Sequence, residues 1–147
     1  MKRANKLQCL TLCETYAKNS NDPHRKVGAL LVLVKNKELS ILQEGYNCLP
    51  QKYENEHICY KDLEGHTKPE VIHAEANAIK YMFENNNQFS LMNGFHYELF
   101  CTTSPCMECA KLIYLSGIKK IYFKEYWKDR KPLQFLKDLG IKHEQIK

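Results

Sequence analysis

The sequence predicts a three-layer α/β/α fold, in which a mixed sheet of about five strands carries helices on both faces. Three observations support this fold class. Short apolar runs typical of strands alternate with segments of helical period, two of the strand-like runs follow each other directly, and turn formers separate the elements. No repeat or linker divides the 147 residues, so we expect one domain over residues 1–147.

The first half of the chain predicts a helix and a hairpin. Residues 1–20 have apolar side chains at a helical period and end in a run of turn formers. Residues 27–34 are rich in Val and Leu, as is typical of a strand covered on both faces. A turn at residues 35–37 leads to a second strand over residues 38–46. Residues 47–71 show no periodicity, which predicts one long loop, functional or disordered.

The second half predicts three helices that alternate with three strands. The expected helices cover residues 72–84, 106–116 and 132–139, and the expected strands cover residues 97–102, 118–123 and 141–146. Asparagines at residues 85–87 break the first of these helices. Gly117 and Gly140 follow the other two, as is typical of helix C-termini.

The composition is that of a soluble globular protein, with 44% hydrophobic and 27% charged residues. No apolar run approaches the ~20 residues of a membrane-spanning helix, and the charged N-terminus has no apolar segment after it, so neither a membrane span nor a secretory signal is expected. Seven cysteines, an odd number, argue for a reducing compartment, which predicts a cytoplasmic protein. The net charge of +5 fits a phosphorylated or nucleic-acid partner, but it is also a common value for a small soluble protein.

Two short motifs carry the chemistry: H-x-E, with His73 and Glu75, and P-C-x-x-C, with Cys106 and Cys109. Two thiols in the first turn of a helix and one imidazole from elsewhere complete a three-ligand zinc site, whose fourth position stays open for water. The helix start favours thiolates at the cysteines. Glu75 is not needed as a ligand and is placed to move protons. The sequence therefore predicts one catalytic zinc per chain, held by His73, Cys106 and Cys109.

A closed structural zinc site is the alternative, and it requires a fourth ligand. The long loop contains His57, Cys59 and His66, which are candidate ligands for a second, structural zinc. This second site is not favoured, because no paired C-x-x-C supports it. The two motifs together are typical of zinc-dependent nucleobase deaminases. Catalysis is therefore favoured over a zinc-stabilised binding module without activity.

Several segments together resemble the deoxycytidylate (dCMP) deaminases, within the wider cytidine and deoxycytidylate deaminase superfamily. They are IHAEANAI at residues 72–79, SPCMECAKLI at residues 104–113, SGIK at residues 116–119, DP at residues 22–23, KVGA at residues 26–29, and GYN at residues 45–47 followed by Pro50. KP at residues 131–132 and LGI at residues 139–141 look most like the phage branch. The resemblance covers nearly the whole chain and is weakest over residues 51–70.

This resemblance implies a cytidine-deaminase-like fold and a hydrolase that converts dCMP to dUMP for dTMP synthesis. Zinc-bound hydroxide would attack C4 of cytosine, and Glu75 would shuttle protons. The resemblance also implies that Asn47 contacts the sugar or base, and that the backbone of Ala74 and Ser104 holds the pyrimidine's carbonyl and amino group. Lys26 and Tyr126 are candidates for the phosphate end, although Lys26 equally fits an exposed lysine at a strand start.

The resemblance further implies a homo-oligomer, a hexamer in many members, with dCTP as activator and dTTP as inhibitor. Cys48 stands where the family usually has a second glycine in Gly-Tyr-Asn-Gly-x-Pro, which leaves regulation open. Other substrates remain as alternatives: a free (deoxy)cytidine, a tRNA adenosine or single-stranded DNA. The tRNA enzymes typically have Glu where this chain has Ser104, and its basic residues are not interleaved with aromatic ones, so a small deoxynucleotide is expected rather than nucleic acid.

Overall fold

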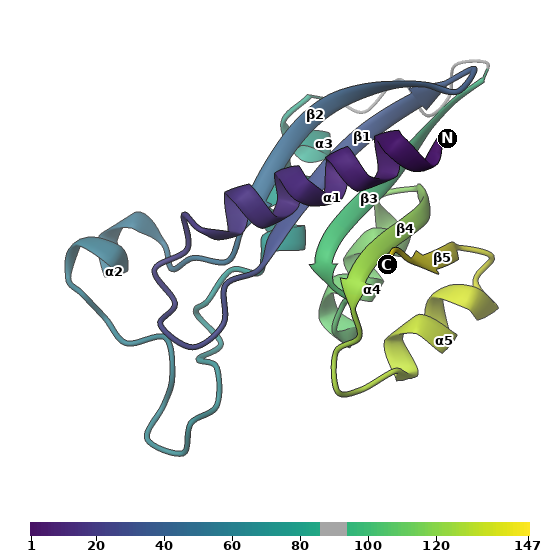
Figure 1. The fold of residues 1–147 in the computed structure, drawn as a ribbon. Helices are drawn as coiled ribbons and strands as arrows, with labels where there is room; N and C mark the ends of the chain where they lie inside the picture. The colour runs from purple at the N-terminus through teal and green to yellow at the C-terminus, as the bar shows by residue number, and fades with distance from the viewer. Residues whose placement is uncertain (86–93) are drawn as a thin grey trace.

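In the computed structural model, residues 1–85 and 94–147 are described, and they form the predicted alternation of helices and strands (Figure 1). The helices are α1 Arg3–Ala17, α2 Gln51–Asn55, α3 Ala74–Glu84, α4 Met107–Leu115 and α5 Lys131–Asp138. The strands are β1 Gly28–Lys35, β2 Glu38–Tyr46, β3 Phe95–Thr103, β4 Ile118–Glu125 and β5 Lys142–Gln145. Apart from α2, each element corresponds to a predicted one.

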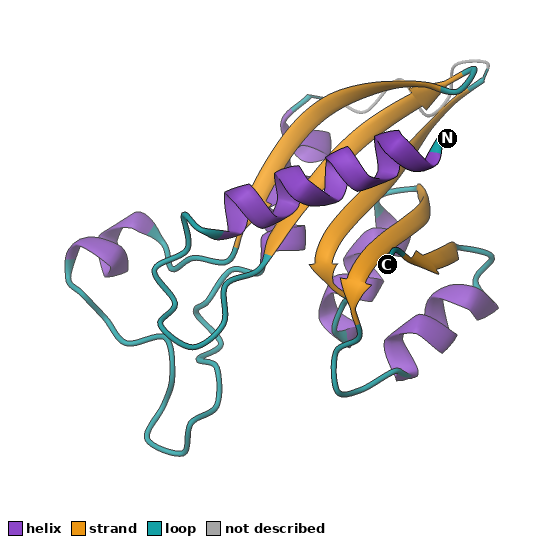
Figure 2. Ribbon diagram, in the orientation of Figure 1, coloured by secondary structure: helices purple, strands orange, loops and turns teal. Residues whose placement is uncertain are grey.

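The five strands form a single mixed sheet in the order β2-β1-β3-β4-β5 (Figure 2). The tight turn at Asn36 and Lys37, both with positive φ, pairs β1 antiparallel to β2. β1 is also antiparallel to β3, whereas β3, β4 and β5 run parallel because helices connect them. The mixed five-stranded sheet is therefore confirmed.

Helices cover both faces of this sheet, as predicted. On one face, α1 packs Cys9, Leu10 and Cys13 against apolar side chains of the central strands. On the other face, α3, α4 and α5 bury a larger cluster that includes Ile79 and Ile113. The alternating residues of β1 divide between the two clusters, and all of them except the terminal Lys35 are buried. The three-layer α/β/α architecture is confirmed, with β3 as the middle strand of its sheet.

The prediction of one long loop over residues 47–71 is wrong in part, because this segment contains α2 and two isolated bridges. The bridges pair Cys48 with Ile72 and Lys61 with Thr67. A helix of five residues after Pro50 is too short to show a helical period in the sequence. Asn85 ends α3 as predicted, while residues 86 and 87 of the expected asparagine break lie outside the described residues.

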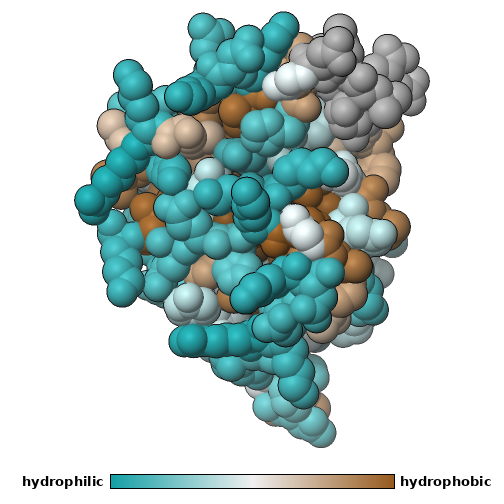
Figure 3. Space-filling view, turned by 90° about the vertical axis from the view of Figure 1, so that its right-hand side faces the viewer, coloured by the Kyte–Doolittle hydropathy of each residue, from teal (hydrophilic) through white to brown (hydrophobic). Residues whose placement is uncertain are grey.

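None of the described helices has the length and apolar content needed to cross a bilayer. The face seen in Figure 3 is covered largely by hydrophilic side chains, with apolar patches between them.

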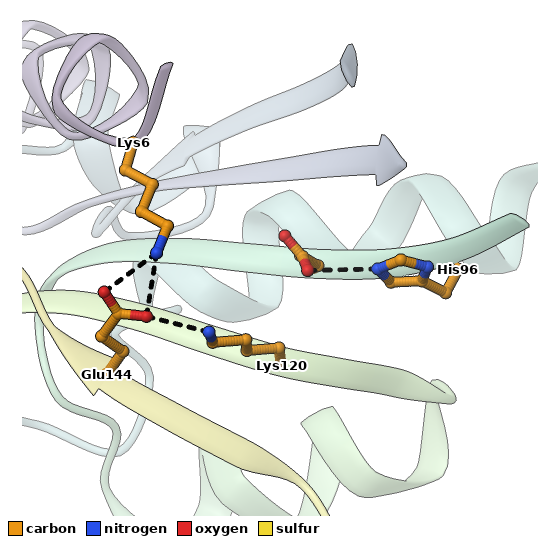
Figure 4. Close-up of polar contacts among 5 residues, drawn as sticks. Lys6, His96, Lys120 and Glu144 are labelled. Carbon is orange, nitrogen blue, oxygen red and sulfur yellow. Dashed lines mark hydrogen bonds and ion pairs between the residues drawn. The ribbon is translucent and has the colours of Figure 1, made fainter. Parts of the chain in front are cut away.

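A small ion-pair network joins α1, β4 and β5 on the sheet face that α1 covers (Figure 4). The Glu144 carboxylate lies 3.0 Å from Lys6 Nζ and 2.8 Å from Lys120 Nζ. The hydrogen bond from Lys120 and the charge of Lys6 lower the pKa of Glu144. The network therefore joins β5 to α1 and β4.

Because the folded-state pKa of Glu144 is depressed, its stabilising contribution is present at neutral pH and disappears as pH falls through that pKa. We expect Glu144→Gln to reduce the free energy of unfolding by up to about 1 kcal/mol at about pH 7, since the carboxylate is partly exposed. The difference should be smaller at an acidic pH below the depressed pKa of Glu144 than at about pH 7, and should approach zero there. Urea unfolding at both pH values measures it, and an equal difference at both would contradict the ion-pair explanation.

Candidate metal centre and active site

Three predicted metal ligands meet where α3 and α4 begin. His73 is the residue that caps the N-terminus of α3, Cys106 caps α4, and Cys109 lies in the first turn of α4. The sulfur atoms of Cys106 and Cys109 each lie 3.4 Å from His73 Nδ1. All three donor atoms are within 4.8 Å of one another. The two helix starts therefore bring both motifs to one point, as the sequence predicts.

Hydrogen bonds couple the titration of the three donor groups. The Cys109 thiol donates to Cys106, and this hydrogen bond, together with that of His73, lowers the pKa of Cys106 to about 4. The same hydrogen bond and burial raise the pKa of Cys109. The hydrogen bond with Cys106 raises the pKa of His73. A cation that displaces the thiol protons would meet two thiolates and an imidazole nitrogen, and this exchange of protons for metal is how such sites bind.

The donor set fits zinc. One imidazole nitrogen and two thiolate sulfurs are preferred zinc ligands, and three protein ligands leave a fourth position for water or substrate. His73 and Cys106 also line a pocket, so the remaining side of the cluster faces a space that substrate can enter. Among the described residues, this is the only group of three or more Cys, His, Asp or Glu side chains with convergent donor atoms.

Glu75 lies beside the ligands but does not belong to their donor group. Its side chain is only 5% exposed, and it lines the same pocket. Burial raises the pKa of Glu75, which favours a carboxyl group that can accept and hold a proton. The carboxyl group is therefore in place for proton transfer inside the pocket.

The pocket in front of the ligands has a volume of about 190 Å³. Its wall is made by the two motifs and by loops at the ends of the strands. The side chains that these loops contribute include Asp22, Arg25, Asn47, Lys61, Thr67 and Trp127. Two of them are cationic, and one is a large aromatic ring.

Asn47 lines the pocket, but its amide is already engaged with the loop before β1. Its Oδ1 accepts from Val27 N at 2.9 Å, and its Nδ2 donates to Arg25 O at 2.8 Å. The Nδ2 also lies 3.4 Å from Asp22 Oδ2. The Asn47 side chain therefore holds the loop that brings Arg25 to the pocket.

The predicted backbone contacts also lie at the pocket. Ala74 begins α3, where the first backbone N–H groups have no partner within the helix. Ser104 follows β3, and its N–H donates to Glu125 O at 2.8 Å. The hydroxyl oxygen of Ser104 accepts from Trp127 N at 2.7 Å. Ser104 thus joins the ends of β3 and β4 and leaves its carbonyl as the backbone group available for a ligand.

The two predicted phosphate contacts are not among the described residues that line this pocket. Lys26 lies in a neighbouring groove with Lys18 and Lys124. The ring of Tyr126 packs edge-on against Phe123 at 4.9 Å and lies 3.8 Å from the Arg130 guanidinium. Their roles at the phosphate end stay a prediction.

Sequence reasoning did not select Arg25, Lys61 or Trp127 as site residues. Arg25, which lines the pocket, directly precedes the Lys26 of the KVGA segment, so this segment lies in the loop that reaches the pocket. Lys61 lies in the stretch without periodicity, and nothing in its sequence neighbours distinguishes it from a solvated lysine.

The residues considered for a second zinc site do not converge. His66 Nδ1 faces carboxylates of its own turn, 3.8 Å from Asp62 and 3.5 Å from Glu64. His57 and Cys59 are exposed. Among the described residues, they form no group of metal-binding geometry.

Comparison with known proteins agrees with the two motifs and with the fold. The model of the cytidine and deoxycytidylate deaminase zinc-binding region matches residues 3–125. The chain belongs to the cytidine and deoxycytidylate deaminase family. It is 35% identical to the deoxycytidylate deaminase of Homo sapiens over 111 residues, which are 73% of this chain but only 57% of the human protein. The family prediction is thereby confirmed.

One solved structure resembles this chain over almost its whole length. The dCMP deaminase from the cyanophage S-TIM5, crystallised in complex with dCMP and dUMP, is 35% identical and superposes with a TM-score of 0.80. The match covers 99% of this chain and 98% of that one. The deoxycytidylate deaminase of Enterobacteria phage T4 is 39% identical over 61 residues, or 42% of this chain and 29% of the phage protein. The family's cytidine-deaminase-like fold is confirmed.

Proposed function

We propose that this protein is a zinc-dependent dCMP deaminase that hydrolyses dCMP to dUMP and so supplies dUMP for dTMP synthesis. The observation that carries the proposal is the position of Glu75, which is buried beside three convergent zinc ligands at the wall of a pocket. The S-TIM5 enzyme, whose chain this one matches along its length, is a dCMP deaminase. A closed structural zinc would need neither a pocket nor a buried carboxyl group beside it.

His73, Cys106 and Cys109 would hold the ion, and zinc in such a site supplies an activated water at neutral pH. Glu75 would take one proton from the attacking water and deliver it to the ring nitrogen. It would then take the second proton, from the hydroxyl added at C4, and give it to the amine as the C4–N bond breaks. The raised pKa of Glu75 suits this double role, because the carboxyl group must both take and return the proton. Burial of Glu75 keeps bulk water away from the transfer.

Recognition of the pyrimidine would come from backbone groups at the two helix starts. We assign the N–H groups that open α3 at Ala74 to the ring carbonyl, and the carbonyl of Ser104 to the amino group, since the Ser104 N–H is already bonded to Glu125. Asn47 would contact the sugar or base while it holds the Arg25 loop. Of these two contacts, the acceptor for the amino group distinguishes cytosine from uracil, because both bases have the ring carbonyl.

A nucleotide rather than a nucleoside is supported by the charge of the pocket wall. Arg25 and Lys61 both line the pocket, and each can bind the phosphate of dCMP. Lys26 and Tyr126 remain proposed contacts for the same end of the nucleotide. Phosphate binding by such cations lowers the KM for dCMP relative to deoxycytidine.

The test is deamination of dCMP and of deoxycytidine, side by side, on zinc-loaded protein, followed by ultraviolet absorbance. We expect kcat/KM for dCMP to exceed that for deoxycytidine by at least about 100-fold, because only dCMP has a phosphate for the cationic residues. Equal rates would contradict a nucleotide enzyme. Turnover of neither, with zinc bound at one ion per chain, would redirect the search to tRNA adenosine or single-stranded DNA.

We further propose that residues 1–147 act as one domain in a homo-oligomer, a hexamer by family resemblance, in the cytoplasm. The single five-stranded sheet supports one domain, and seven free cysteines support a reducing compartment. dCTP and dTTP are the proposed effectors. Cys48 Sγ lies 3.3 Å from Asn77 Nδ2 on α3, so its side chain replaces a glycine beside the catalytic helix. The deamination assay with and without dCTP tests this regulation.

A further inference from the structure

Three parts of the pocket wall come from segments that are far apart in the sequence. Asp22 lies between α1 and β1, Asn47 follows β2, and Lys61 lies between α2 and α3. Figure 1 shows that the chain from α2 to the start of α3 extends away from the sheet. A segment that projects in this way needs contacts of its own to keep Lys61 at the pocket.

Glu54, on α2, bonds to all three segments, each within two residues of a pocket-lining side chain. Its Oε1 accepts from Leu49 N at 2.9 Å and from the Tyr60 hydroxyl. Its Oε2 accepts from Asn21 Nδ2 at 3.0 Å. Asn21 precedes Asp22, Leu49 follows Asn47 by two residues, and Tyr60 precedes Lys61. One carboxylate thus connects the three loops.

Two of the partners of Glu54, Leu49 and Tyr60, belong to a small apolar cluster. Leu49, Tyr60 and Val71 are buried there, and Tyr53 packs against them. Although partial burial opposes it, the hydrogen bonds from Tyr60 and Asn21 lower the pKa of Glu54, so the carboxylate is charged at neutral pH. Hydrogen bonds to a charged acceptor are stronger than those between neutral groups.

Hydrogen bonds within residues 60–68 connect Tyr60 to Lys61 and Thr67, which line the pocket. Lys68 N donates to Tyr60 O at 2.9 Å, and Lys61 Nζ donates to Thr67 Oγ1 at 2.6 Å. The Asp62 carboxylate accepts from His66 N at 2.9 Å within the turn. Residues 60–68 therefore form a compact hairpin-like unit, and the place where Tyr60 is held determines where Lys61 and Thr67 lie.

We propose that Glu54 is a positioning residue, which holds the loops carrying Asp22, Asn47 and Lys61 in the arrangement that binds the nucleotide. The proposal rests on the proposed function for its substrate. Glu54 does not line the pocket, so it acts through the residues that it orients. Its loss should weaken substrate binding more than it slows the chemical step, since the zinc ligands and Glu75 belong to α3 and α4.

Glutamine at position 54 is a sharp test, because all three partners of Glu54 are donors. An amide of the same size offers one acceptor oxygen in place of two and carries no charge, so it cannot keep all three charge-assisted hydrogen bonds of the carboxylate. We expect Glu54→Gln to raise the KM for dCMP about tenfold, with kcat within about twofold of wild type and zinc content unchanged. Glu64→Gln is the matched control, since Glu64 is an exposed carboxylate of the same segment, and it should leave KM unchanged.

A second substitution tests whether the contact between Asn21 and Glu54 depends on pairing a donor with an acceptor. Asn21→Asp supplies an acceptor for the glutamine NH₂, so the double variant Asn21→Asp with Glu54→Gln should recover most of the lost affinity. Asn21→Asp alone places two carboxylates together and should raise KM. An unchanged KM in Glu54→Gln would overturn the proposal. So would a fall in kcat together with loss of zinc, because Glu54 would then stabilise the protein generally.

Amide hydrogen exchange gives a result that does not depend on turnover. The amides of Leu49, Asp62 and Lys68 are bonded within or beside the three loops, and they should exchange at least about tenfold faster in Glu54→Gln than in wild type. Unchanged exchange would overturn the positioning role. A wild-type protein that does not deaminate dCMP would overturn the proposed function alone, and exchange would still decide the role of Glu54.

Discussion

Glu75→Gln is expected to lower kcat for dCMP by about 10²- to 10⁴-fold, the usual contribution of a positioned acid–base group. Glutamine keeps the size of the side chain and fills the same buried space, but it cannot accept a proton from water and pass it to the substrate. The zinc ligands are untouched, so zinc should remain at one ion per chain. Steady-state turnover and metal analysis on the same sample measure both quantities.

Two companion variants separate proton transfer from metal binding. Glu108→Gln changes an exposed carboxylate of α4 that contacts Lys111, and it should retain full activity. Cys106→Ala removes a ligand and should lose zinc and turnover together. A Glu75→Gln protein that still deaminates dCMP at the wild-type rate would falsify the mechanism.

Gly45→Ala should combine a large loss of stability with a loss of metal affinity. A Cβ atom at Gly45 would lie 2.3 Å from Ala74 O and 2.6 Å from Ala78 N. Both atoms belong to the backbone of α3 and cannot rotate aside, so the helix must move away from β2. We expect a decrease of about 1–3 kcal/mol in the free energy of unfolding, as for other overpacked sites.

The displaced helix begins next to His73 and carries Glu75, so the damage should extend to the active site. We expect weaker zinc binding and lower kcat/KM in Gly45→Ala, measured by competition with a zinc chelator and by the deamination assay. Ser40→Ala, at an exposed position of the same strand, is the control and should change neither quantity. Normal zinc affinity in a destabilised Gly45→Ala protein would show that α3 can shift without moving His73.

Most of the fold could be predicted because its elements have strong patterns of their own. The apolar run at residues 27–34 became a strand buried on both faces, and Gly117 and Gly140 have the positive φ typical of residues that follow a helix. The helix α2 was missed because five residues contain little more than one turn. Its stability comes from Glu54 and the cluster of Leu49, Tyr60 and Val71, which are contacts between distant segments.

The candidate site also has a part that the sequence predicts, the metal ligands, and a part that it does not, the pocket wall. His73, Cys106 and Cys109 could be predicted because metal coordination requires particular residue types at short spacings. The pocket wall could not, because an arginine or a lysine in a loop has the same local sequence whether it faces substrate or solvent. Arg25, Lys61 and Trp127 reach the pocket only through the packing of their loops. Asn47 lines the pocket, and its bonds to Val27 and Arg25 depend on the tertiary structure.

The distance in sequence between the ligands has a consequence for the order of folding. His73 lies 33 residues from Cys106 and 36 from Cys109, and the strand β3 must pair with β1 between them before the helix starts can meet. During synthesis His73 leaves the ribosome first, and both cysteines follow only later. An unfolded chain offers zinc little more than the Cys106–Cys109 pair, so tight metal capture should come late and serve as a kinetic marker of a completed sheet.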